Sequence, residues 1–270
     1  MEIGISTASF FSKETTESSL ELLNKFKIPV CEVFLSTFYE YKDAFIDELL
    51  KKKGTTRVFS IHTLNQQFEP ELFNPVERTR RDCEEIFTQV AKCGGRLDAQ
   101  YYTFHGPAKF KKLPYVHNYP KIGKRVEELC DMVYNYSGGK TQLCYENVHW
   151  TFFNTPEFFD NLQQYTRIDT CLDIKQAMLS DFDIYDYIKS MGSRLKNVHL
   201  CDFDNNRKLG IPGKGTFDFV KLFATLIENG YEGPAMIEVY SNDYSSYDEL
   251  LKSYDFLVEC LYKANNYGGI

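Results

Sequence analysis

The sequence lacks the features that mark membrane proteins, linkers and exported chains. No apolar run approaches the roughly 20 residues that a membrane-spanning helix needs. No Gly/Ser tract, Pro-rich stretch or long run of one charge interrupts the 270 residues, so no segment has the composition of a linker. Residues 1–11 lack the basic region that opens a secretory signal. We therefore expect one domain over residues 1–270, located in the cytoplasm and not in a membrane.

The eight cysteines form no C-x-x-C pair. Most of them fall inside apolar stretches, where a thiol packs as a small hydrophobic group. Thiols scattered in this way disfavour a zinc–thiolate site and are typical of a reducing compartment.

Basic residues are also in deficit. The 31 Lys and Arg are outnumbered by 38 Asp and Glu, which gives a formal net charge of −7. Because binding to phosphates requires clustered Lys and Arg, this balance makes nucleic acid an unlikely partner.

Eight short apolar runs alternate with longer helical patterns. The runs are nearly continuous in hydrophobicity, as expected for parallel strands that are covered on both faces. They span residues 2–6, 30–35, 58–62, 99–105, 142–146, 168–173, 195–200 and 235–239. Eight such units in this length predict an α/β fold, a single (β/α)8 TIM barrel. An open doubly wound sheet is the competing fold, but the turn after the first strand lacks the G-x-G-x-x-G pattern that such sheets often carry.

The segments between these runs show helical periodicity, for example over residues 76–91, 122–133 and 250–261. Glycines are expected just after helices, where a left-handed residue ends the helix. On this basis we expect helix ends before Gly54, before Gly94 and Gly95, before Gly138 and Gly139, and before Gly230 and Gly233.

Polar residues close six of the predicted strands. Active sites of barrels form at the carboxyl ends of the strands, so these side chains are expected to meet at one mouth. They are His62, His105, Glu146, Asp173, His199 and Glu238. Any one of them has an ordinary structural explanation, but three buried carboxylates together need a counter-ion. A divalent cation (Mn, Mg, Co or Zn) is the simplest one, because oxygen and imidazole ligands suit these metals.

Several motifs in this order resemble the xylose isomerase-like barrel superfamily. They read Y-E-N at 145–147, C-L-D-I-K-Q-A at 171–177, N-V-H-L-C-D at 197–202, P-G-K-G at 212–215 and I-E-V at 237–239. The resemblance implies that Glu146, Asp173, His199 and Glu238 hold one metal ion. It also implies that Glu146 and Glu238 act as the catalytic acid and base. In endonuclease IV of this superfamily, histidines corresponding to His62 and His105 hold a second metal, so a second ion is left open.

The chain also departs from its relatives at three places. Gln176 stands where many members have a histidine, and the segment after Asp202 lacks an Asp-x-His pair. Both are needed for the third metal of endonuclease IV, so a nuclease is disfavoured. Phe152 stands where the ketose 3-epimerases have a second glutamate, so their details of sugar binding do not transfer.

Six further residues are candidate substrate contacts. Lys175, Gln176, His149, Trp150 and Asp202 follow the same strand ends. For Arg207 the resemblance implies the contact, because the epimerases have an arginine near this point, although the spacing differs. The backbone amides of the glycine-rich turn around Lys214, together with Lys214 itself, could bind a phosphate or a carboxylate, although the turn is not a Walker loop.

Together these patterns predict a metal-dependent isomerase or epimerase of a sugar or sugar phosphate, acting through an enediolate. The alternatives are a dehydratase of the inosose or dehydroshikimate type, an endonuclease IV-like nuclease, and a sugar-binding barrel without catalysis. Assembly into a homo-oligomer is left open.

Overall fold

A computed structural model describes residues 1–64, 68–106, 118–151 and 154–266. Eight parallel strands close into a barrel, and each strand pairs with its neighbours in the chain until the last pairs with the first. The strands are β1 (Ile3–Ser6), β2 (Val30–Leu35), β3 (Arg57–Thr63), β4 (Tyr101–Phe104), β5 (Gln142–Glu146), β6 (Asp169–Asp173), β7 (Leu195–Leu200) and β10 (Ala235–Ile237). The (β/α)8 fold predicted from the sequence is confirmed.

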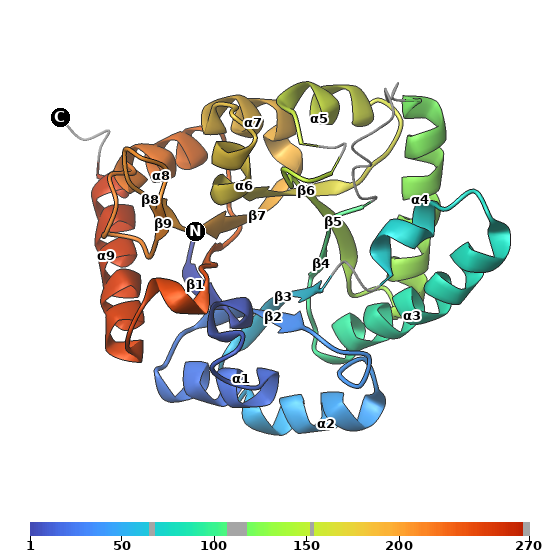
Figure 1. Cartoon of the computed structure of the whole chain (residues 1–270), viewed down its shortest axis with the longest axis horizontal. Coiled ribbons are helices and arrows are strands. Elements are labelled where there is room, and N and C mark those ends of the chain that lie inside the picture. The colour runs from blue at the N-terminus through green and yellow to red at the C-terminus, as the bar shows by residue number, and fades with distance from the viewer. Residues whose placement is uncertain (65–67, 107–117, 152–153, 267–270) are drawn as a thin grey trace.

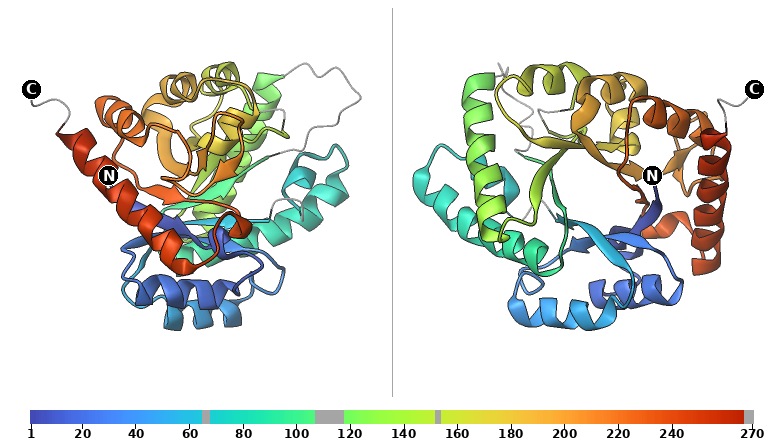
Figure 2. Two further views of the ribbon diagram at one scale, coloured as in Figure 1. Left: turned by 60° about the vertical axis from the view of Figure 1, so that its left-hand side comes forward. Right: turned by 180° about the vertical axis from the view of Figure 1, so that it is seen from behind.

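Helices surround the barrel on its outside, as the two faces in Figure 1 and Figure 2 show. They are α1 (Thr16–Lys25), α2 (Asp43–Lys52), α3 (Glu77–Arg96), α4 (Tyr119–Tyr136), α5 (Pro156–Leu162), α6 (Ile174–Leu179), α7 (Ile184–Met191), α8 (Phe219–Glu228) and α9 (Tyr247–Asn265). Short 3-10 turns are η1 (Thr7–Phe10), η3 (Glu69–Phe73), η4 (Gly192–Arg194) and η5 (Ser241–Asp243), and β8 (Asp202–Phe203) pairs antiparallel with β9 (Leu209–Gly210). None of the described helices is both long and apolar enough to cross a membrane.

Two of the six strands that carry site residues, β4 and β10, end earlier than the sequence predicted. Strand β4 ends at Phe104, because the N–H of His105 donates to the Glu69 carboxylate at 3.0 Å and not to a neighbouring strand. Strand β10 ends at Ile237, and the N–H of Val239 donates to the Ser9 hydroxyl at 3.3 Å. In both places a side chain takes over a backbone donor, which sequence periodicity does not reveal.

The glycine signals were correct at most helix ends. Gly54, Gly138 and Gly230 have positive φ angles of 54°, 69° and 72°. The prediction for Gly94 and Gly95 was wrong, because both lie inside α3. They are small for a packing reason: a Cβ on Gly94 would lie 2.8 Å from the Thr141 hydroxyl, and a Cβ on Gly95 would lie 2.2 Å from the Ser137 carbonyl oxygen.

The close approach at Gly95 predicts a costly substitution. We expect Gly95→Ala to lower the free energy of unfolding by about 1–3 kcal/mol, the usual cost of overpacking, because backbone atoms cannot move aside as a side chain can. Urea denaturation measures the change. Gly210→Ala is the matched control, since nothing lies within 4 Å of its Cβ position, and a similar loss there would contradict the packing explanation.

Strand alternation places three levels of side chains inside the barrel. Val30, Phe59, Met236 and Tyr101 form an apolar cluster at the amino-terminal end of the strands. Closer to the carboxyl ends, the next level of inward-facing side chains is polar. It includes Glu32, Ser60, Thr103 and Asn197, all fully buried. The next step along each strand reaches the carboxyl ends, where the sequence predicted the site.

Candidate metal centre

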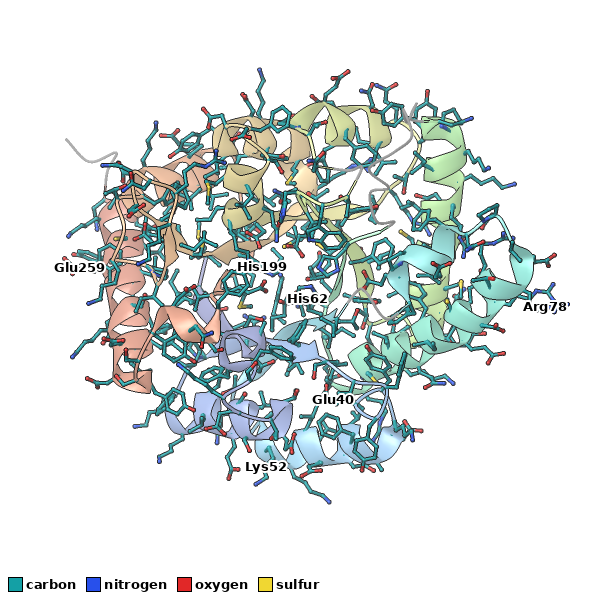
Figure 3. The ribbon with its side chains drawn as sticks, viewed as in Figure 1. Glu40, Lys52, His62, Arg78, His199 and Glu259 are labelled. Carbon is teal, nitrogen blue, oxygen red and sulfur yellow. The ribbon has the colours of Figure 1, made fainter. Side chains whose placement is uncertain are left out.

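All six predicted ligands lie at the carboxyl ends of the strands, and each is buried. Glu146 and Asp173 are the last residues of β5 and β6. His62 and His199 are the next-to-last residues of β3 and β7, while His105 and Glu238 directly follow β4 and β10. Figure 3 shows the labelled His62 and His199 inside the ring of strands. Strands β3 and β4 from the first half of the chain and β5, β6, β7 and β10 from the second half therefore contribute to one cluster.

The two histidines of β3 and β4 meet over the Glu146 carboxylate. The Nε2 atoms of His62 and His105 are 2.8 Å apart. Glu146 Oε2 lies 3.2 Å from His105 Nε2 and 3.7 Å from His62 Nε2. One ligand atom from each of the three residues falls within 4.8 Å of the others.

Glu238 connects the remaining residues to this group. Its Oε2 lies 3.3 Å from His199 Nδ1 and 3.6 Å from His62 Nδ1. Glu146, Asp173 and His199 also offer ligand atoms that lie within 4.8 Å of one another. Three of the four residues that the superfamily resemblance assigned to one metal thus lie within reach of one ion, and the fourth, Glu238, lies beside His199.

The hydrogen bonding of this cluster is incomplete in a way that suits a cation. Five buried atoms have no hydrogen bond of normal geometry: His62 Nδ1, Glu146 Oε2, Asp173 Oδ2, His199 Nδ1 and Glu238 Oε2. Buried polar atoms are nearly always satisfied in proteins, so five unsatisfied polar atoms in one cluster call for a missing partner. Carboxylate oxygens and imidazole nitrogens are donors that divalent metals accept. The residues present therefore fit a metal ion.

Glu32 lies directly beneath the cluster and was not predicted. This fully buried carboxylate of β2 accepts hydrogen bonds from Ser60 at 2.7 Å, Thr103 at 2.8 Å and Asn197 at 3.0 Å. It also lies 3.2 Å from His199 Nε2 and 3.3 Å from His62 Nδ1. A carboxylate that binds the far nitrogen of a histidine fixes the orientation and tautomer of the ring, as is common around metals.

Glu69 has the same relation to His105. Its Oε2 lies 3.0 Å from His105 Nδ1, and its Oε1 accepts from Thr63 at 2.6 Å and Tyr102 at 2.7 Å. This leaves His105 Nε2 directed at Glu146. All three histidines of the cluster are therefore held by buried carboxylates.

Charge coupling within the cluster is strong. Burial disfavours a charged imidazole, yet contacts with Glu238 and Glu32 raise the pKa of His62 to about 10. Burial likewise opposes ionisation of Glu238, yet His199, His62 and Lys175 lower its pKa to about 2. Burial dominates at Asp173, where it raises the pKa to about 6 against the effect of Lys175. Such perturbed groups are typical of functional sites.

Three predicted substrate contacts adjoin the cluster. Lys175 and Gln176, in the first turn of α6, are buried. Gln176 Oε1 accepts from the N–H of His149 at 3.2 Å and lies 2.5 Å from His149 Nδ1. These contacts tie the loop after β5 to the start of α6.

Trp150, in the same loop after β5, lies next to the metal cluster. Its ring centroid lies 5.6 Å from that of His105, so the aromatic face borders the predicted ligands. Phe152, the departure from the epimerase pattern, lies outside the described residues.

Asp202 and Arg207 make contacts of another kind. Both oxygens of Asp202 accept backbone N–H groups, from Phe203 and Phe217 at 2.8 and 3.1 Å and from Gly213 and Gly215 at 2.9 Å each. Two amides of the glycine-rich turn around Lys214 therefore bind a carboxylate of the same chain. The guanidinium of Arg207 contacts Met178 in α6 and Asp181 in the loop that follows α6. Roles of Asp202 and Arg207 in substrate binding stay predictions.

The two carboxylates that were missed differ in the signal they left. Glu32 is a charge inside the otherwise apolar run V-C-E-V-F-L, and a buried charge in a central strand is costly enough to mark a polar interior or a site. Glu69 lies in η3 after β3 and reaches His105 only through the path of that loop. Because Glu69 lies in a short turn, the periodicity of strands and helices gives no signal for it.

The barrel and this centre define a class of protein, a (β/α)8 barrel with a carboxylate–histidine cluster at the carboxyl ends of its strands. Within that class, the family model described as xylose isomerase-like TIM barrel matches residues 20–260. The chain belongs to this family. No curated protein matches it in sequence.

Solved structures with the same fold cover nearly the whole chain. A D-tagatose 3-epimerase-like protein is 18% identical with a TM-score of 0.79, covering 99% of each chain. A D-psicose 3-epimerase from Clostridium cellulolyticum H10, solved with D-tagatose, is 17% identical with a TM-score of 0.79, covering 97% of this chain and 99% of that one. The IOLI protein with a bound zinc atom is 16% identical with a TM-score of 0.77, covering 98% and 99%. At these identities the similarity establishes the fold.

Proposed function

We propose that the protein is a divalent-metal-dependent isomerase or epimerase of a sugar or sugar phosphate. The observation that carries this proposal is the group of five buried atoms without hydrogen bonds on His62, Glu146, Asp173, His199 and Glu238. Glu146, Asp173, His199 and Glu238 would hold one ion. His62 and His105, which share Glu146, form a candidate second position.

A divalent cation bound there would polarise a hydroxyl and a neighbouring carbonyl oxygen of the substrate as a Lewis acid. The protein supplies the acid and the base. Glu146 and Glu238 approach from β5 and β10, which are separated in the barrel by β6 and β7. One carboxylate can therefore take a proton from carbon while the other delivers one, which is the requirement of epimerisation and of aldose–ketose isomerisation.

The sugar class of the substrate rests on the relatives. Two of the structures of the same fold are named for epimerisation of D-tagatose and D-psicose, which are small ketoses. The aromatic ring of Trp150 beside His105 also suits a sugar face. A zinc atom is named in the IOLI structure, but the ligand types here accept Mn, Mg, Co and Zn alike.

Dehydration of an inosose or a dehydroshikimate-type compound is the second candidate, because the same proton abstraction begins it. A nuclease and a sugar-binding barrel without catalysis are less well supported. Three residues of the endonuclease IV pattern are replaced here, beginning with Gln176, and a binding module has no use for two acid–base carboxylates beside a cation site.

Solvent isotope exchange tests the proposal. Protein loaded with Mn²⁺ or Co²⁺ is incubated in D₂O with a panel of ketoses, ketose phosphates and polyols, and deuterium uptake into carbon is followed by mass spectrometry. We expect uptake with at least one compound, and its loss in Glu146→Gln and Glu238→Gln. Lys189→Gln, on the outer helix α7, is the control and should behave as the wild type.

The alternative functions predict other results. A dehydratase releases water, so mass spectrometry would show a product lighter than the substrate by one water. A nuclease would exchange no sugar proton and would cleave abasic-site DNA in a separate assay. Sugar binding without any exchange across the panel would contradict the proposal and favour a non-catalytic barrel.

We further propose a reducing, cytoplasmic location. All eight cysteines are buried free thiols, which is the state expected in such a compartment.

A further inference from the structure

A buried lysine, Lys175, lies among the predicted ligands. Of the described residues, it is the one buried lysine or arginine in this cluster. Only 5% of the residue is exposed. Its Nζ lies 3.6 Å from Asp173 Oδ2 and 3.7 Å from Glu238 Oε1. It is also 5.0 Å from the centroid of the Tyr240 ring, which covers one side of it.

These distances are too long for hydrogen bonds, since N–H···O bonds in proteins span about 2.7–3.2 Å. Within the described part of the chain, no oxygen comes within hydrogen-bonding distance of this ammonium. A buried ammonium normally uses its donors, because an unsatisfied charged donor is costly. Lys175 is therefore held in place by charge and by the Tyr240 ring, while its N–H groups are left for another acceptor.

The position of Lys175 is unfavourable if its purpose is to support the metal. Both nearby oxygens belong to residues that would hold the cation, and a second positive charge beside them opposes metal binding. A cation kept at this cost suits an anion that forms during the reaction.

We propose that Lys175 is a catalytic residue that donates a hydrogen bond to the substrate oxygen which becomes negatively charged when the carbon-bound proton is removed. This inference rests on the proposed function and deepens it. In the ground state the acceptor is the neutral carbonyl oxygen. When Glu146 or Glu238 takes the proton, the electron pair of the C–H bond forms a C=C bond, the π pair of the carbonyl moves onto its oxygen, and the ammonium lies ready without reorganisation. Return of the proton to carbon restores the neutral acceptor.

Two binding measurements test this proposal without an identified substrate. Mn²⁺ affinity is measured by calorimetry on apoprotein, and binding of glycolohydroxamate, an anionic mimic of an enediolate, is measured on the Mn²⁺-loaded protein. Dihydroxyacetone serves as the neutral probe. The variants are Lys175→Met, which keeps the length of the side chain and removes its charge, and Lys175→Arg, which keeps the charge.

In Lys175→Met we expect Mn²⁺ to bind at least about tenfold more tightly, because a like charge has been removed. Glycolohydroxamate should bind about 10- to 100-fold more weakly, the range for a lost hydrogen bond to a charged group. Dihydroxyacetone affinity should change far less, and Lys175→Arg should recover most of the hydroxamate affinity. Lys52→Met, an exposed lysine paired with Glu21, should change none of these values.

The contrary results are distinct. Weaker Mn²⁺ binding in Lys175→Met, or hydroxamate affinity equal to that of the wild type, would overturn the role of Lys175 and leave the proposed function standing. A wild-type protein that takes up no Mn²⁺ would overturn both. Thermal unfolding of each variant, with a single transition near that of the wild type, verifies that the measurements report on a folded barrel.

Discussion

Glu238→Ala protein, purified without chelator, should lose the divalent metal that we expect at near-stoichiometric amount in the wild type. The substitution removes the oxygen that lies 3.3 Å from His199 Nδ1 and 3.6 Å from His62 Nδ1. It leaves two carboxylates and the histidines, which is too few well-placed oxygens to retain the ion through purification. Elemental mass spectrometry measures the metal content directly.

Glu232→Ala is the control for this experiment, because Glu232 is exposed and precedes the same strand. It should retain the metal. If the wild type contains none, even after addition of Mn²⁺, Co²⁺ or Zn²⁺, the isomerase mechanism fails and the carboxylate–histidine cluster needs another explanation.

Glu32→Gln should weaken metal binding by about 10- to 100-fold, although Glu32 is not among the four predicted ligands. The carboxylate holds His199 and His62 from below and accepts from Ser60, Thr103 and Asn197. A glutamine can reproduce at most one of its two acceptor oxygens, and its NH₂ group would face donors. The histidine rings then lose their fixed orientation. Competition with a metal-binding dye measures the affinity.

Glu40→Gln is the matched control for Glu32→Gln. Glu40 is also buried and accepts from Thr16 at 3.1 Å, but none of the predicted ligands is among its partners. Both variants should be less stable than the wild type, because a carboxylate bound by several donors has been replaced. Only Glu32→Gln should lose metal affinity. Equal losses in both would mean that the effect is general destabilisation.

The barrel could be predicted from the sequence because its signal is local and repeated. A parallel strand covered on both faces must be apolar along its whole length, and the intervening helices must be amphipathic. Each of the eight strands therefore left its own run, and the polar residues that closed six of them marked the mouth. The order of elements in a (β/α)8 barrel then fixes which ends meet. Glu146, Asp173, His199 and Glu238 needed no knowledge of the loops to be found.

What lies beside those strand ends was decided by tertiary structure. Glu69 reaches His105 through the path of η3, and Asp202 collects four amides from residues up to 15 positions away. Gly94 and Gly95 are required by the closeness of Thr141 and Ser137, which are remote in sequence. Lys175 lies between Asp173 and Glu238 because α6 begins directly at the end of β6. Periodicity records which face of an element is buried, whereas these contacts depend on where loops and helix starts lie in space. The sequence by itself therefore determined the barrel and predicted the residues that meet at its mouth, and only the folded chain determined what holds and surrounds them.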